Sequence, residues 1–196
     1  MKTRILSWLL FTLCLVGVTA VWIVGPRPDP SVPAHRIPVL AMVPDFTLLD
    51  QFGKPFQKTA LDGSVWIADF IFTSCAGQCP EMTRQMVLLQ EKLPPEVRLV
   101  SFSVDPTRDT PDLLRRYAEQ NGARQERWYF LTGDLPAVRE LSLKTFSFAF
   151  DDSAQEITHS GRFALVDKRG AVRGTFDSSD PDAMKQLLAQ AKELAR

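Results

Sequence analysis

Apolar residues follow two kinds of spacing along the chain from Asp45 onward. The mostly apolar runs Val65–Phe72 and Val97–Val104 are typical of strands that are buried on both faces of a sheet. Between them, apolar residues recur at helical spacing from Met82 to Leu93, and Pro94-Pro95 ends this helix. The pattern therefore predicts two central strands joined by a helix.

The rest of this region predicts further strands and helices. They are a hairpin formed by 46–50 and 55–56, a helix that Thr110-Pro111 opens, a strand at 128–131, a helix from Pro136, local pairing at 147–150, a hairpin formed by 162–167 and 171–176, and a final helix from Asp180-Pro181. Strands that alternate with helices, followed by a terminal hairpin and helix, predict an α/β fold in which helices flank both faces of a mixed sheet.

The N-terminal segment predicts a membrane anchor. Residues 5–24 carry no charge, and such a run is long enough to cross a bilayer core about 30 Å thick. Lys2 and Arg4 precede it, which predicts a cytoplasmic N-terminus and an exported remainder. A cleaved signal peptide is the alternative, with a weak cleavage site at residues 18–20. Because the apolar run continues to Val24, the sequence favours an uncleaved transmembrane helix over residues 1–24.

A proline-rich linker is predicted between this anchor and the folded region. Residues 25–44 contain six of the 14 prolines, and proline both fixes φ and lacks the amide donor that a helix needs. The segment should therefore be extended and semi-rigid. The predicted organisation is an anchor at 1–24, a linker at 25–44 and a single domain at 45–196.

Composition excludes several classes of function. Hydrophobic residues make up 45% and charged residues 23% of the chain, as in an ordinary globular protein. The formal net charge is zero, so nothing favours binding to nucleic acid. Three cysteines are too few for a disulfide-stapled scaffold, which directs attention to the positions of the two that lie close together.

Cys75 and Cys79 carry the candidate chemistry. They follow directly after the first long strand, at the predicted start of a helix, and open α/β sheets place their sites at this edge. The amide groups at a helix start favour an anionic sulfur, so we expect a thiolate here. The spacing suits either a disulfide or a shared metal ion, and a purely structural disulfide is an alternative that an exported domain permits.

His159 is the candidate third ligand, because it is the only histidine beyond the predicted linker. In a thioredoxin-like sheet its segment would lie beside the cysteine loop, which would give a site of two sulfurs and one nitrogen. A structural zinc site would require a fourth ligand, whereas copper accepts this donor set. A loop or core histidine is the alternative interpretation.

Two carboxylates complete the predicted site. Asp69 lies within the first apolar strand, where a buried carboxylate needs a partner and could tune the nearby cysteines. Asp105 follows the second strand and could either support the site or simply form the turn before Pro106.

Three segments resemble the Sco (SenC/PrrC) family. Residues 69–80 are similar to the family's C-x-x-x-C-P segment, residues 103–111 to its S-V-D-P-x-x-D-T-P segment, and residues 158–160 to the segment that holds its histidine ligand. The resemblance covers about residues 43–194. It implies a thioredoxin-like fold that binds copper through two cysteines and one histidine. It also implies delivery of copper to the copper A centre of cytochrome c oxidase, or reduction of the thiols there. One departure is that residues 76–78 lack the proline that many members carry after the first cysteine.

The sequence thus predicts a membrane-anchored copper chaperone whose domain lies on the exported face, in the periplasm or outside a bacterial inner membrane. It would carry one copper ion, as Cu(I) or Cu(II), and a separate exported thiol reductase would keep its cysteines reduced. A thiol–disulfide oxidoreductase or a copper or redox sensor is the alternative. An enzyme of the thioredoxin type would normally carry C-x-x-C and a facing cis-proline, and this chain has no proline between Pro136 and Pro181.

Overall fold

The computed structural model describes residues 37–75, 77, 79–147, 150–151, 158–159 and 161–196. The predicted anchor, most of the predicted linker and His35 lie outside these residues. Within the described ranges, no helix combines the length and apolar character that a bilayer crossing requires. The strands are β1 (Ala41–Met42), β2 (Thr47–Leu49), β3 (Pro55–Gln57), β4 (Trp66–Ile71), β5 (Arg98–Ser103), β6 (Trp128–Leu131), β7 (Phe150–Asp151), β8 (Thr158–His159), β9 (Arg162–Val166) and β10 (Ala171–Asp177).

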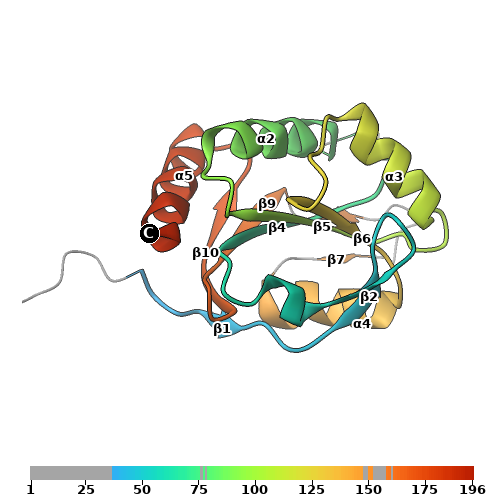
Figure 1. Ribbon diagram of the computed structural model, residues 1–196, viewed down its shortest axis with the longest axis horizontal. Coiled ribbons are helices and arrows are strands. Elements are labelled where there is room, and N and C mark those ends of the chain that lie inside the picture. The colour runs from blue at the N-terminus through green and yellow to red at the C-terminus, as the bar shows by residue number, and fades with distance from the viewer. Residues whose placement is uncertain (1–36, 76, 78, 148–149, 152–157, 160) are drawn as a thin grey trace, which may run out of the picture. The chain divides into compact units, whose positions relative to one another are not determined.

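A six-stranded sheet in the order β1-β10-β9-β4-β5-β6 forms the centre of the fold (Figure 1). The neighbours β4, β5 and β6 run parallel, whereas β9 is antiparallel to both β4 and β10. Parallel neighbours need a crossover between them, and helices make both of these connections. The predicted mixed sheet is therefore confirmed.

Helices cover both faces of this sheet, as Figure 1 shows. On one face lie α2, α3 and α5, and on the other lie α4 and the β2–β3 hairpin. The helical segments are η1 (Lys58–Leu61), α2 (Cys79–Lys92), α3 (Pro111–Gln120), α4 (Leu135–Glu140), the π-helical turn η2 (Leu141–Thr145) and α5 (Pro181–Ala195).

Burial on both faces explains why the sequence of β4 is mostly apolar. Trp66 and Phe70 pack into the cluster beneath α4, whereas Ile67 and Ile71 pack beneath α2. None of these side chains is more than 1% exposed. Since both faces are covered, the alternation of apolar and polar positions seen in half-exposed strands is absent.

Side-chain caps fix where three helices begin. Thr110 accepts a hydrogen bond from the Leu113 amide, Asp134 from the Ala137 amide and Asp180 from the Asp182 amide, and a proline occupies the first turn each time. Such caps satisfy amide groups that the helix itself leaves free. The predicted starts at Thr110-Pro111 and Asp180-Pro181 are confirmed.

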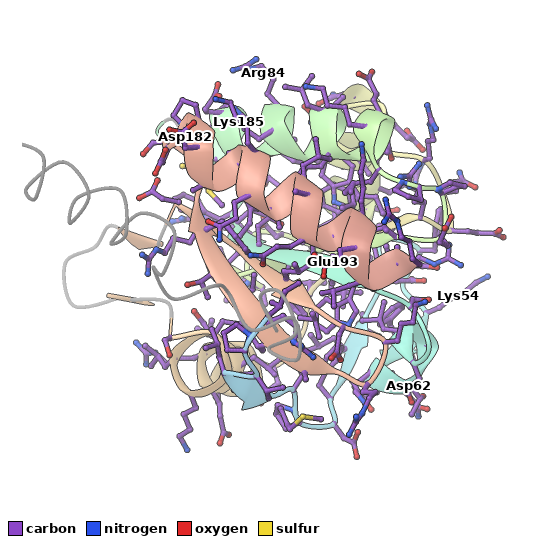
Figure 2. All side chains as sticks on the ribbon, turned by 90° about the vertical axis from the view of Figure 1, so that its left-hand side faces the viewer. Lys54, Asp62, Arg84, Asp182, Lys185 and Glu193 are labelled. Carbon is purple, nitrogen blue, oxygen red and sulfur yellow. The ribbon has the colours of Figure 1, made fainter. Side chains whose placement is uncertain are left out.

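The helices α2 and α5 lie side by side on one face of the sheet (Figure 2). Their charged side chains project outward, and the ends labelled Arg84, Asp182 and Lys185 lie at the solvent surface. Leu187 and Ala191 of α5 are fully buried against the sheet. The amphipathic pattern of the final helix is therefore matched by its packing.

The compact unit begins at Ile37, earlier than the expected boundary at Asp45. The strand β1 lies inside the predicted linker: the Leu40 amide donates to the Val172 carbonyl over 2.8 Å, and the Val43 amide donates to the Gly170 carbonyl over 2.9 Å. Proline excludes a helix but is compatible with a short edge strand, so a proline-rich segment can still pair with the sheet.

Phe102 is the centre of an aromatic cluster on the α4 face. Its ring stacks on Phe70 with centroids 5.1 Å apart, meets Phe46 edge-on at 5.5 Å and lies 6.5 Å from Phe146. The side chain is fully buried. Because Phe70 is two residues before the cysteine turn, this cluster also supports the end of β4.

We expect Phe102→Ala to lower the free energy of unfolding by about 3–5 kcal/mol, because it leaves a cavity in a closely packed cluster. Urea unfolding of the purified chain measures this change. Phe52→Ala is the matched control, since Phe52 is 45% exposed, and it should cost no more than about 0.5 kcal/mol. Equal losses in the two variants would contradict the cluster's importance.

Candidate metal centre

The two cysteines lie where β4 passes into α2. A turn follows Ile71, closed by a hydrogen bond of 3.2 Å from the Cys75 amide to the Phe72 carbonyl. The helix α2 then begins at Cys79. This arrangement puts both residues at the carboxyl end of a parallel strand, the edge predicted from the sequence.

The two thiols differ in their access to solvent. Cys75 is half-buried, whereas Cys79 is 1% exposed. The Gly77 amide donates to the Cys75 sulfur over 3.4 Å. An incoming ion or partner therefore meets Cys75 first, and an amide donor is already directed at that sulfur.

Burial raises the pKa of the Cys79 thiol far above its ordinary value. A hydrogen bond from the Phe72 backbone to the Cys79 sulfur opposes this rise, while the adjacent Cys75 thiol and the charge of Asp69 add to it. The expected thiolate at the helix start is therefore wrong for Cys79 in the metal-free protein, because desolvation outweighs the helix terminus. Cys79 is a protonated thiol until something displaces its proton.

Asp69 is a buried carboxylate beneath the cysteines. It is fully enclosed, lies on the α2 face of β4 between Ile67 and Ile71, and neither oxygen has a well-formed hydrogen bond among the described residues. Burial raises the pKa of Asp69 to about 7, and Ser101, opposite it on β5, only partly opposes that rise. Its charge also contributes to the raised pKa of Cys79, which supports the predicted proximity to the site.

A second buried carboxylate, Asp109, contacts the cysteine turn directly. Its two oxygens accept the Thr73 amide, each over 3.2 Å, and one of them accepts the Thr73 hydroxyl over 2.5 Å. The other oxygen accepts the Ser103 hydroxyl over 2.6 Å. Asp109 was not among the residues predicted for the site. Its position after the strand next to the cysteines was the one signal in the sequence that could have indicated such a role.

Asp105, by contrast, is engaged within its own loop. Its oxygens accept the Thr107 hydroxyl over 2.7 Å and pair with Arg108 over 3.2 Å. Its amide donates to the Ser103 hydroxyl over 3.1 Å, and its carbonyl accepts the Asp109 amide over 2.8 Å. Asp105 is thus separated from the cysteine turn by Ser103 and Asp109.

The third predicted ligand, His159, is described only in its backbone. It pairs with Phe150 between β8 and β7, and its side chain lies outside the described part of the structure. The antiparallel register of β9 against β4 brings the beginning of β9 toward the end of β4. Among the described side chains, no three histidine, cysteine or acidic residues gather as a metal cluster.

The chain belongs to the SCO1/SenC family, whose profile matches residues 36–196. A SCO1/SenC family lipoprotein from Bacillus anthracis shares 33% identity and a TM-score of 0.72, covering 81% of this chain and 98% of that one. BsSco, described as a member of the Sco family of cytochrome c oxidase assembly proteins and as having a disulfide switch, shares 34% identity and a TM-score of 0.72 over 81% and 96% of the two chains. A Stutzerimonas stutzeri protein whose name proposes copper binding is 33% identical over 76% of each chain. The thioredoxin-like fold and the resemblance to the Sco family are confirmed.

We expect the stability of reduced, metal-free protein to depend on pH through Asp69. Its pKa is raised to about 7 in the folded state. The unfolded chain therefore ionises this carboxyl near pH 4 while the folded chain keeps the proton. Stability is lost as the pH rises between these values, by up to about 4 kcal/mol.

Asp69→Asn should remove that loss, so the variant becomes progressively more stable than the parent chain between about pH 4 and pH 7. Urea unfolding across this range measures the difference. Asp182→Asn serves as an exposed control that should show no such trend. A stability difference between Asp69→Asn and the parent that does not vary with pH would refute this assignment.

Proposed function

We propose that the protein binds one copper ion through Cys75, Cys79 and His159 and delivers it to the copper A centre of cytochrome c oxidase. The observation that carries this proposal is the pair of cysteine sulfurs at the carboxyl end of β4, one half-buried and one enclosed. Sulfur ligands suit Cu(I), and an added imidazole suits Cu(II). The copper-binding name of one relative and the oxidase-assembly description of another support it.

The two thiols have different parts in this function. Cys75 lies where an incoming carrier or receiving protein can reach it, so exchange of copper begins and ends at this sulfur. Cys79 is enclosed and gives up its proton only when copper replaces it. The amide of Gly77 stabilises the charge that develops on the Cys75 sulfur. A site with one accessible ligand can hold copper and still release it.

Asp69 and Asp105 act around the ligands in this proposal. Asp69 places a titratable carboxyl beneath Cys79, where its charge disfavours a lone thiolate and favours a bound cation. Asp105 acts indirectly, through the hydrogen bond that its amide donates to the Ser103 hydroxyl. Neither residue is a proposed copper ligand.

We also propose that residues 1–24 anchor the domain on the exported face of the membrane, with residues 25–36 as the tether. The uncharged run after Lys2 and Arg4 supports this placement. The description of one solved relative as a lipoprotein supports attachment to a membrane. In such an oxidising compartment, a thiol reductase would be the partner that keeps the cysteines able to bind copper.

Reduction of the copper A thiols, or redox sensing, is the second candidate function. The two cysteines lie four residues apart, and the Cys75 thiol contacts Cys79 closely enough to raise the pKa of Cys79. Closure to a disulfide would release two electrons to an oxidised partner. The disulfide switch ascribed to BsSco favours keeping this candidate.

We expect Cys75→Ser and Cys79→Ser each to abolish tight Cu(I) binding, because each removes half of the sulfur ligands. Titration of the reduced full chain in detergent against a chromogenic Cu(I) chelator measures the affinity. His159→Ala should alter the Cu(II) spectrum more than the Cu(I) affinity, since two thiolates can hold Cu(I) alone.

The chain offers a matched control for each change. Cys14→Ser removes the third thiol and should leave one copper bound per chain, and His35→Ala removes the other histidine without effect on the spectrum. An unchanged Cu(II) spectrum in His159→Ala would exclude this residue from the site. Unchanged Cu(I) affinity in either single cysteine variant would exclude the dithiol site.

A further inference from the structure

The side chain of Asp109 joins the turn that carries Cys75 to the loop that follows the neighbouring strand β5. Thr73, the second residue of this turn, donates both its amide and its hydroxyl to the carboxylate of Asp109. Asp109 follows β5, the strand that runs parallel to β4, so the contact joins two loops at the same edge of the sheet.

The orientation of the Asp109 carboxylate is fully determined. Ser103 occupies one oxygen over 2.6 Å, Thr73 occupies the other over 2.5 Å, and the Thr73 amide lies at equal distance from both. The side chain is 0% exposed, and within the described part of the chain no cation pairs with it. A buried carboxylate with this set of donors has one favourable orientation, because rotation would leave its oxygens unsatisfied.

The backbone of Asp109 is fixed as well. Its amide donates to the Asp105 carbonyl over 2.8 Å, and the next residue, Thr110, caps α3. The carboxylate is therefore held by β5 and α3 on one side and holds Thr73 on the other. A rigid partner of this kind reduces the number of conformations that the cysteine turn can adopt.

We propose that Asp109 is a positioning residue for the dithiol, which acts through Thr73 to hold the turn of residues 72–75 so that the Cys75 sulfur faces Cys79. For copper affinity this proposal rests on the proposed function. The equilibrium between dithiol and disulfide involves only the two sulfurs of the chain itself. For this equilibrium, the proposal does not depend on the proposed function.

Loss of the Asp109 contact should weaken both properties of the pair. A turn with more accessible conformations brings Cys75 near Cys79 less often, so the effective concentration of one thiol at the other falls. The same loss separates the two ligands of a shared ion, and partners that orient ligands typically contribute 10–100-fold to metal affinity.

Thr73→Val tests the proposal, because it removes the hydroxyl donor with little change of shape while leaving the amide in place. Thr73→Ser keeps the hydroxyl and should restore the parent behaviour. Ser179→Ala is the control: it removes a hydroxyl hydrogen bond of similar length, 2.6 Å to Asp177, that contacts neither Asp109 nor the cysteine turn. Asp109→Asn removes one acceptor oxygen and should act in the same direction as Thr73→Val.

Two equilibria are measured on the full chain in detergent, in a Cys14→Ser background. The first is the fraction of Cys75–Cys79 disulfide formed against mixtures of oxidised and reduced dithiothreitol, in which the oxidised reagent takes the two electrons and two protons of the dithiol. The second is Cu(I) affinity against a chelator. Thr73→Val should lower both constants about ten-fold, whereas Thr73→Ser and Ser179→Ala should change them less than about three-fold.

The outcomes separate the positioning role from a purely structural one and from the proposed function. If Thr73→Val lowers stability but leaves both constants unchanged, as Ser179→Ala should, the contact with Asp109 only stabilises the fold and the proposal is overturned. If the dithiol constant falls in Thr73→Val but the parent chain binds no copper, the positioning role stands and the proposed function fails. Thr73→Val decides the question even where Asp109→Asn does not fold.

Discussion

Burial of β4 on both faces is the constraint on which the rest of the structure depends. Its apolar side chains join the two hydrophobic clusters on opposite sides of the sheet, and its pairing with β5 and β9 fixes its direction. A strand held in this way ends at a defined point. The cysteine turn and the start of α2 follow from that end, so the position of both thiols is set by the core rather than by the loop.

The same burial determines the electrostatics of the site. Asp69 lies in the core beneath α2, and Cys79 lies at the start of α2. At both positions, removal from water favours the protonated form of the side chain. Asp69 is unfavourable for stability near neutral pH, and its two oxygens lack well-formed hydrogen bonds among the described residues. A bound cation would reverse this balance, since it would favour both ionised groups.

Most of the fold could be predicted from the sequence, because its signals are local. The apolar run at β4 and the cap at Thr110 each depend on a few neighbouring residues. The strand β1 could not be predicted in this way, because two residues between prolines carry no periodicity and pair only when β10 lies beside them. The short helix η1 was missed for a similar reason, since four residues give too little pattern.

The cysteine pair could also be predicted, since its spacing and its place after a strand are visible in the chain. Asp109, the residue that supports the pair, could not be predicted. Asp105 and Asp109 both follow β5, and only the path of their loop determines that Asp105 faces Thr107 and Arg108 whereas Asp109 faces Thr73. A single sequence does not contain that information, because it arises from the packing of two loops far apart in the chain.

The proposed function requires above all that both sulfurs bind copper in their reduced form. The most direct measurement compares copper binding by the dithiol and disulfide forms of the full chain with Cys14 replaced by serine, together with a count of free thiols. Because the proposed ligands are thiolates, we expect one copper per chain in the dithiol form and no tight binding in the disulfide form. Stoichiometric binding while the Cys75–Cys79 disulfide remains intact would contradict it.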